Sequence, residues 1–531
     1  MPEHHHHHDA PAPNEKLGKV DFPTSCAPAS QAGIERGVAL LHSFGYVNAQ
    51  YQFEAIAKDD PTCAMAHWGI AMTQFQELWQ QPEEPQIKRG TDEMAKARAL
   101  AAPPAKITAR EQAYIDALSA FFSPGNVTYL ERATAYNQKM NALHAAFPDD
   151  VEGAAFDALS MLASVPPGDT SLSHEHQALA ILVPLFAAHP DHPGLAHYII
   201  HTCDTPALAA DGLSAAREYA KIAPSSPHAL HMPAHIFARL GMWQEDIDSN
   251  LASVAASEKD EAAHEPGAAH QMHADEFLIY AWLQVGQDEK ARNLTAKMQS
   301  IGERMASMPG MDDMKMSGPY FTNELNAIYA MEMHDWKAAA ALKPIPGSPE
   351  YDGYSYWAQG VAAGHLHDPA LAASALANVD KSIEALKHSP FASGVDSIIK
   401  ISRNEVLAWQ AYAQDRPDEA VTYMRQAADQ QDKLGQGEVD IPAREMLGDL
   451  LLMEHKPGEA LAEYRIALEL SPNRLNGLLS AGYAAEQSNQ PDQARAYYSA
   501  AAHQTKNAAT STRPELAHAI QFATTATASG R

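Results

Sequence analysis

The chain has 531 residues and a formal net charge of −28, because 38 Lys plus Arg stand against 66 Asp plus Glu. This excess of negative charge would repel a phosphate backbone or an anionic membrane surface, so neither nucleic acid nor a membrane is an expected partner. No apolar run approaches the ~20 residues needed to cross a bilayer, and we expect a globular chain.

The N-terminus contains a run of histidines, His4–His8, that indicates an expression tag, so residues 1–20 are expected to be tag and flexible N-terminus. A tag here also suits a protein whose export signal was removed, and we expect a periplasmic or secreted location. The chain has three cysteines. In an oxidising compartment Cys26 and Cys63 could form a disulfide and leave Cys203 as a free thiol. In a reducing compartment all three would stay thiols, and both alternatives stay open.

The C-terminal part shows the clearest internal repeat. Small and aromatic residues recur at the tetratricopeptide (TPR) spacing of 34, in the order Gly448, Ala460, Tyr464 and Ala467, then Gly482, Ala494, Tyr498 and Ala501. Small residues let two antiparallel helices approach closely, and the aromatic residue fills the groove between them. Weaker copies extend to Gly37 and Phe53, and no strand-like alternation of useful length occurs. The sequence predicts an all-α fold, a TPR-like α-solenoid in which antiparallel helical hairpins form a superhelix with irregular insertions.

Breaks rich in proline interrupt the repeat. Pro166–Asp169 is expected to form a turn, and Pro309–Pro319 a loop longer than the usual hairpin connection. A further break at Pro344–Pro349 precedes plainer repeats. We therefore predict a histidine-rich TPR-like region over residues 21–340, which carries the metal site, and C-terminal TPR repeats over residues 341–531.

Two clusters of potential metal ligands stand out. The members of each are spaced so that they fall on one narrow helix face: His197, His201 and Asp204 in the first, and His228, His231 and His235 in the second. Imidazole is the commonest transition-metal ligand, and two histidines one turn apart can bind one ion without bending the backbone. Because six ligands exceed the need of one tetrahedral ion, either two metals or one metal with supporting histidines is expected.

Pro233 leaves the helix of the second cluster open to two interpretations. If the helix begins at Pro227, the three histidines span a kink at Pro233. If it begins later, His228 lies in the preceding loop. In both cases His231 and His235 are the preferred pair of metal ligands in this cluster.

Other residues are candidates for supporting roles. His273 shares a helix face with Glu276, so we expect His273 to be a further ligand or, together with Glu276, a catalytic acid or base. His42 and His67 are weaker candidates, and the preferred interpretation of both is a hydrogen-bonded histidine of the core or groove. Cys203 is expected to be a ligand or a packed thiol rather than a nucleophile.

Methionines recur along the predicted long loop, as Met305, Met308, Met311, Met314 and Met316. Thioethers select Cu(I), so this loop could capture copper. Methionine is also a common gap-filler, and a loop that folds over a hydrophobic groove or an apolar ligand is the preferred alternative.

Five stretches of the sequence resemble a group of exported bacterial TPR proteins: Phe22–Cys26, Glu35–Phe44, Cys63–Ala71, His192–Asp204 and His228–Trp243. The resemblance spans much of the first 340 residues, and the two histidine stretches are its most specific part. It implies the fold and export, and it implies no activity. Asp246 stands where such repeats usually place alanine, which puts the regularity of that hairpin in doubt.

These observations favour a metal-binding TPR-like protein, in particular a metalloenzyme with a histidine-ligated mono- or dinuclear centre. The scarcity of carboxylates among the candidates favours copper, with zinc or iron as alternatives. Copper would support oxidative chemistry and make the protein an oxidoreductase, whereas zinc would activate a water for hydrolysis. Two alternatives stay open: a periplasmic TPR scaffold for a peptide or protein, and a copper storage or delivery protein without turnover. The expected partner is a small molecule or peptide in the concave groove, and the oligomeric state is not predicted.

Overall fold

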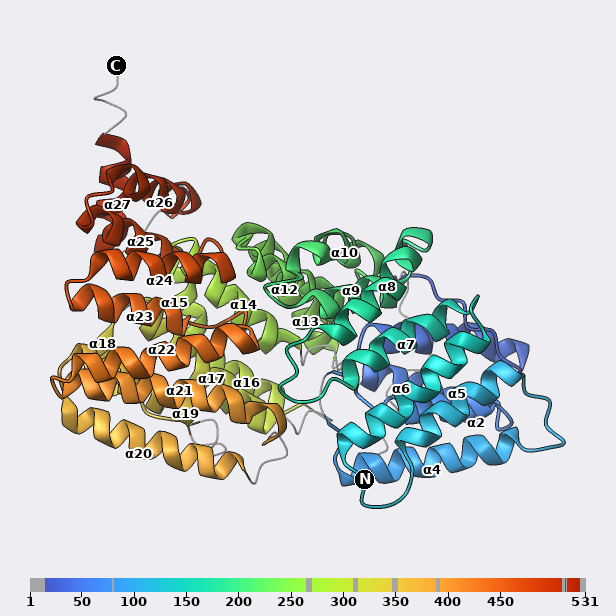
Figure 1. The fold of residues 1–531 in the computed structure, drawn as a ribbon. Helices are drawn as coiled ribbons and strands as arrows, with labels where there is room; N and C mark the ends of the chain where they lie inside the picture. The colour runs from blue at the N-terminus through green and yellow to red at the C-terminus, as the bar shows by residue number, and fades with distance from the viewer. Residues whose placement is uncertain are drawn as a thin grey trace. The chain divides into compact units, whose positions relative to one another are not determined.

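The structure is a computed structural model that describes residues 15–78, 81–263, 270–308, 314–345, 352–387, 392–508, 511 and 513–525. Over these residues the chain forms α-helices and one short 3-10 helix, with no β-strand (Figure 1). The predicted all-α, TPR-like fold is confirmed. None of the described helices combines the length and the apolar character that crossing a bilayer requires.

The chain divides into two compact units. Unit 1 holds the described residues up to Asp204 and the segment Ala210–Pro233, and unit 2 holds Thr205–Ala209 and the described residues from Ala234 onward. The division into regions 21–340 and 341–531 rests on the regularity of the repeat rather than on compactness, and it stays a prediction.

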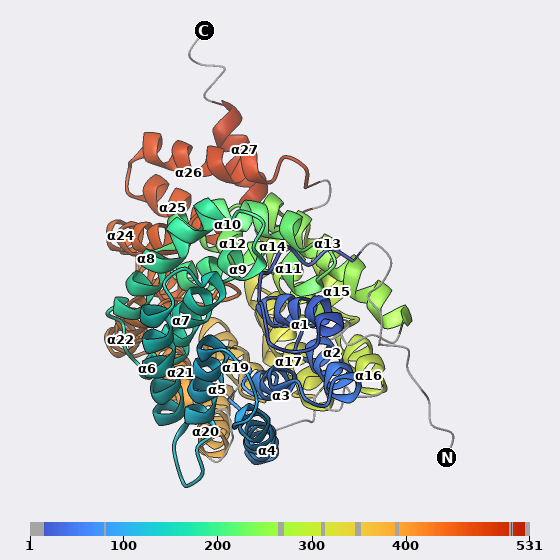
Figure 2. The ribbon, with the colours of Figure 1, turned by 90° about the vertical axis from the view of Figure 1, so that its right-hand side faces the viewer.

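Unit 1 is built from helices that pack in sequence order. Their bounds are η1 (Pro28–Ser30), α1 (Gln31–His42), α2 (Tyr46–Asp59), α3 (Ala64–Met72), α4 (Glu84–Ala101), α5 (Ala109–Phe121), α6 (Tyr129–Ala146), α7 (Val151–Ala163), α8 (Ser173–Ala188), α9 (Pro193–Cys203), α10 (Ala209–Ile222) and α11 (Pro227–His231). Figure 2 shows α1, α2 and α3 side by side. The later helix α9 packs against α1 and α7, which brings its histidines to the end of α1.

The N-terminal segment of unit 1 is held by a disulfide and by aromatic packing. Cys26 and Cys63 form the disulfide, so this predicted alternative is the one that the structure adopts. Phe22 is fully buried and stacks on Trp68 with 5.3 Å between ring centroids. Cys63 directly precedes α3, so the bond joins the N-terminal segment to the start of that helix.

Unit 2 continues as a series of helical hairpins. Its helices are α12 (Pro233–Arg239), α13 (Trp243–Ala263), α14 (Gln271–Gln284), α15 (Asp288–Thr295), α16 (Met298–Ala306), α17 (Met314–Glu332), α18 (Trp336–Ala341), α19 (Gly353–His365), α20 (Pro369–Leu386), α21 (Ala392–Ala413), α22 (Pro417–Leu434), α23 (Ala443–Met453), α24 (Pro457–Leu470), α25 (Leu475–Gln487), α26 (Pro491–Gln504) and α27 (Pro514–Thr525). From α19 to α27 each helix packs against the next, and Figure 1 shows these helices in orange and red as one stack.

The TPR pattern explains how the hairpins pack. A Cβ added at Gly448 would lie 2.5 Å from the ring of Tyr464, and one at Gly482 would lie 2.4 Å from the ring of Tyr498. Gly37 and Phe53 show the same relation in unit 1, with a separation of 2.5 Å. The first helix of each of these hairpins therefore needs glycine so that the aromatic ring of the second can lie against its backbone.

Gly448→Ala tests this packing. The new methyl group must displace the ring of Tyr464, and overpacking of this kind costs about 1–3 kcal/mol, offset by about 0.5–1 kcal/mol of better helix propensity. The matched control is Gly458→Ala, since a Cβ at Gly458 meets no atom within 4 Å. We expect a lower urea midpoint for the first variant and an unchanged or higher one for the control. Equal midpoints would contradict the packing account.

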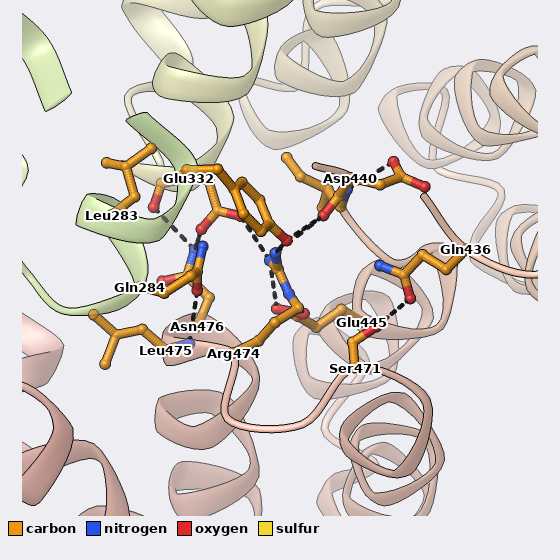
Figure 3. A network of polar contacts seen from close by, with 12 residues as sticks. Leu283, Gln284, Glu332, Gln436, Asp440, Glu445, Ser471, Arg474, Leu475 and Asn476 are labelled. Atoms are coloured by element: carbon orange, nitrogen blue, oxygen red, sulfur yellow. Dashed lines mark hydrogen bonds and ion pairs between the residues drawn. The ribbon is translucent and has the colours of Figure 1, made fainter. Parts of the chain in front are cut away.

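A buried arginine joins four helices of unit 2 (Figure 3). The guanidinium of Arg474 pairs with Glu332 at 2.7 Å and with Glu445 at 2.6 Å, and it donates to the backbone carbonyl of Asp440 at 3.0 Å. It also donates to the hydroxyl of Tyr280. Because these partners come from α14, from α17, from α23 and from the segment before α23, Arg474 at the start of α25 ties distant parts of the unit together.

Candidate metal centre

The helix α9 places His197 and His201 inside unit 1. Pro193 begins the helix, where no backbone N–H is needed, and Nδ1 of His192 accepts the backbone N–H of Leu195 at 3.2 Å as the N-cap. Every residue of α9 is buried except His201, which is half-buried.

The helix α11 places His228 in the same unit. It begins at Pro227, as in one of the two predicted alternatives, and the side chain of Ser226 accepts a backbone N–H of its first turn. The helix ends at His231, and α12 begins at Pro233. The second histidine cluster is therefore divided between two short helices, because proline cannot continue the backbone ladder.

Three histidines meet in unit 1, and we call His197, His201 and His228 the histidine trio. One ring nitrogen of each lies within 4.8 Å of those of the other two. The Nε2 atoms of His197 and His228 are 3.0 Å apart. This separation suits two adjacent ligands on one ion, for which metal–nitrogen bonds are about 2.0–2.1 Å long. The same separation suits a hydrogen bond between the two rings. The positions of the ring protons therefore decide whether both Nε2 atoms can bind an ion.

The tautomer of His197 follows from its backbone partner. Its Nδ1 lies 2.6 Å from the carbonyl oxygen of His42. Because a carbonyl oxygen only accepts, the proton is on Nδ1, and Nε2 presents its lone pair toward His228. Metal-bound histidines commonly donate their second N–H to a backbone carbonyl in this way, which orients the ring and raises its basicity.

A buried network holds His42 in turn. Glu152 accepts from Nε2 of His42 at 2.6 Å and from Nε2 of His192 at 3.0 Å, and Tyr198 donates its hydroxyl to Nδ1 of His42 at 2.8 Å. Although burial raises it, the two imidazoles bring the pKa of Glu152 well below its usual range, so the carboxylate is charged. Burial lowers the pKa of His42, which is therefore neutral at physiological pH. The interpretation of His42 as a hydrogen-bonded core histidine is confirmed.

Aromatic rings surround the histidine trio. The ring centroid of Phe44 lies 4.4 Å from that of His197, 5.2 Å from that of His201 and 5.5 Å from that of His228. Tyr219 stacks on His197 with 5.0 Å between centroids. His197 and His228 are 0% and 1% exposed, whereas His201 is half-buried. His201 is therefore the most exposed member of the trio, although its Nε2 atom is buried.

Three other residues singled out from the sequence lie in unit 1. Asp204 caps the C-terminus of α9 and does not join the atoms that meet in the trio. The ring of His231 lies 6.4 Å from that of His228. Cys203 is fully buried, and burial raises the pKa of its thiol to about 12, to which Asp211 and Asp204 add. A thiol that stays protonated at neutral pH is a poor nucleophile, which agrees with the packed-thiol alternative.

The remaining predicted site residues lie in unit 2. Nδ1 of His273 is 2.8 Å from Oε2 of Glu276, so the predicted pairing of these two residues is present. Nδ1 of His235 is 3.1 Å from Oε1 of Glu438. Burial raises the pKa of Glu276 to about 8, and Glu438 adds to the shift.

The weaker histidine candidates have partners of their own. Nδ1 of His67 lies 2.6 Å from Oε2 of Glu93, which confirms the hydrogen-bonded interpretation. His270, the residue before α14, is a further histidine of unit 2: burial lowers its pKa to about 4, with a contribution from His273. A neutral His270 is expected at physiological pH.

The methionine stretch is only partly a loop. Met305 lies in α16 and is fully buried in the core of unit 2, and Met308 packs against that core, so both act as gap-fillers. Met311 lies outside the described residues, as do the side chains of Met314 and Met316.

The prediction of a loop over Pro309–Pro319 is wrong from the start of α17 at residue 314 onward. Gly318 is there for close packing rather than for a turn, because a Cβ at Gly302 of α16 would lie 2.8 Å from its Cα. Helix packing therefore overrode the proline and glycine signal.

Sequence reasoning missed Phe44, Glu152 and Glu438. Phe44 ends one of the stretches that resemble exported TPR proteins, so a signal for it existed. Glu152 and Glu438 follow no spacing rule, and only the fold brings each of them to its histidine.

Comparisons with known proteins find distant structural similarities only. No family model matches the sequence, and a search of curated proteins finds no match. The chain is similar to the P58(IPK) TPR domain, with 16% identity over 72% of this chain and 100% of that one, at a TM-score of 0.22. It is also similar to human IFIT1, solved as a dimer with m7Gppp-AAAA, with 13% identity over 84% and 90% of the two chains, at a TM-score of 0.36. These scores are too low to support an inference about ligands. A TPR-like helical fold fits a scaffold or binding role, and the described histidine clusters could hold a metal.

Proposed function

We propose that this protein binds one transition-metal ion at the histidine trio of unit 1. The observation that carries the proposal is the pair of Nε2 atoms 3.0 Å apart, of which the one on His197 is oriented by the carbonyl of His42. A peptide-binding groove gives no reason to bury three imidazoles around one point, because burial of polar groups costs free energy unless they are paired.

Copper is the preferred metal, and zinc is the alternative. Imidazole suits both ions, and copper binds nitrogen donors more tightly than its first-row neighbours do. Three protein ligands leave a fourth position for water or substrate, as in catalytic zinc sites. We therefore propose a metalloenzyme, with oxidative chemistry if the ion is copper and hydrolysis if it is zinc.

Export and a groove ligand belong to the same proposal. The Cys26–Cys63 disulfide supports an oxidising compartment, since structural disulfides persist outside the reducing cytosol. The substrate would be a small molecule or peptide that enters beside His201, the most exposed member of the trio.

Metal content of the full chain, freed of its histidine tag, tests the proposal. After loading with Cu(II) or Zn(II) and dialysis, His197→Ala/His228→Ala should hold one equivalent less than the wild type. The matched control is His67→Ala, another histidine of unit 1 that is paired with a carboxylate, and its metal content should equal that of the wild type. Equal metal content in the double variant and the wild type, with both folded by circular dichroism, would overturn the proposal.

A second measurement tests the open position. Azide added to the Cu(II)-loaded protein should give a new charge-transfer band if the ion has an exchangeable ligand. A loaded protein that gives no such band would indicate a closed, structural or storage site rather than an enzyme.

A further inference from the structure

Unit 2 brings together two histidines of its own. His235 lies on α12 and His273 on α14, and the ring centroids are 5.6 Å apart. One ring nitrogen of each lies within 4.8 Å of that of the other. Phe277 lies against both, with centroids 4.8 Å from His235 and 5.3 Å from His273, so one side of the pair is apolar.

Each of these imidazoles has a carboxylate at Nδ1. The partner of His235 is Glu438 at 3.1 Å, and that of His273 is Glu276 at 2.8 Å. A carboxylate at Nδ1 fixes the tautomer so that Nε2 presents its lone pair, which is the arrangement found behind metal-bound histidines. Each histidine of the pair therefore has a carboxyl group of its own at Nδ1. Glu276 lies on α14, and Glu438 lies in the segment before α23.

Acidic side chains lie around the pair. Glu324 of α17 is 4% exposed and interacts with Glu276, and its Oε2 has no hydrogen-bond partner in the part of the chain that the structure describes. Arg239 pairs with Glu438 at 3.2 Å.

We propose that unit 2 holds a second metal site, in which His235 and His273 bind a divalent transition-metal ion through Nε2 and Glu276 and Glu438 orient the two rings. The side chains of His235 and His273 are 12% and 30% exposed, so an ion and its remaining water ligands have access from solvent. Two imidazoles supported by carboxylates select Cu(II), Zn(II) or Ni(II) rather than Ca²⁺ or Mg²⁺. This site is independent of the histidine trio and goes beyond the function proposed for it.

The test uses the full, tag-free chain with the trio already removed. In the His197→Ala/His228→Ala background, titration with Ni(II) or Zn(II) should show one remaining equivalent. Adding His235→Ala/His273→Ala should abolish it, whereas His518→Ala should not, because His518 belongs to unit 2 and has its own carboxylate partner, Glu486. A background variant that binds no ion would overturn the second site and leave the trio untouched.

A conservative substitution tests the second site with less disturbance of the fold. Glu438→Gln keeps the shape of the side chain and should weaken binding at the second site about 10–100-fold, as loss of an outer carboxylate does. Unchanged affinity in this variant would contradict the orienting role of Glu438. Conversely, His235→Ala/His273→Ala in an otherwise wild-type chain should retain one equivalent at the trio, so the two sites succeed or fail separately.

Discussion

Replacing Arg474 with methionine is expected to lower the free energy of unfolding by about 3–5 kcal/mol, the cost of removing one partner from a buried ion pair. The side chain of Arg474 is 2% exposed, and those of Glu332 and Glu445 are 0% and 6% exposed. Without the guanidinium, two carboxylates of unit 2 would stay buried with no cation to balance them. Urea unfolding of the full chain, followed by circular dichroism, measures the effect.

Two controls separate this charge effect from a general loss of packing. Arg474→Met/Glu332→Gln/Glu445→Gln removes the charges together and should recover much of the loss, because replacing a whole buried ion network is often nearly neutral. Arg416→Met changes an arginine that is 46% exposed and pairs with Glu419, so it should shift stability by less than about 1 kcal/mol. A triple variant no more stable than Arg474→Met would contradict the electrostatic explanation.

Glu152→Gln is expected to destabilise unit 1 by about 2–4 kcal/mol, because charge-assisted hydrogen bonds are worth about 1.5–3 kcal/mol each. The carboxylate accepts from His42 and His192, and an amide offers one acceptor oxygen where the network needs two. One imidazole N–H would then be buried against an NH₂ group. Glu486→Gln is the matched control and should have a smaller effect, because Glu486 is half-buried and accepts from the exposed His518.

The same variant should change how stability depends on pH. The folded-state pKa of Glu152 lies below its ordinary value of 4.5, so the carboxylate stabilises the fold above that pH and the contribution disappears as pH falls. Burial lowers the pKa of His42 in the wild type, and Glu152 opposes that shift. The stability difference between wild type and Glu152→Gln should therefore be largest near neutral pH and should shrink toward pH 3. A difference that is constant with pH would show that Glu152 is not charged in the fold.

The fold was predictable because its signal is local. Gly448 and Tyr464 lie within one repeat, and the requirement for a small residue opposite a ring is visible in the spacing alone. The same holds for His197 and His201, which one helical turn brings to the same face.

The composition of the site was less predictable because it depends on long-range packing. Helical spacing grouped Asp204 with His197 and His201, whereas the fold groups His228 with them, through the approach of α11 and α9 in unit 1. Likewise, Glu438 reaches His235 across about two hundred residues of sequence. No periodicity within a single helix carries such information.

The separation of the trio's ligands along the sequence has a consequence for biosynthesis. The three ligands of the trio are not made together: His197 and His201 leave the ribosome first, and His228 follows 27 residues after His201. At ~5–20 residues per second this delay is about 1–5 seconds, during which two ligands of the trio have been made and the third has not. The two cysteines of the N-terminal disulfide precede all three ligands in the chain. An ion that needs all three imidazoles is therefore retained only after α11 has been made, so metal loading comes at the end of unit 1 folding rather than guiding its start.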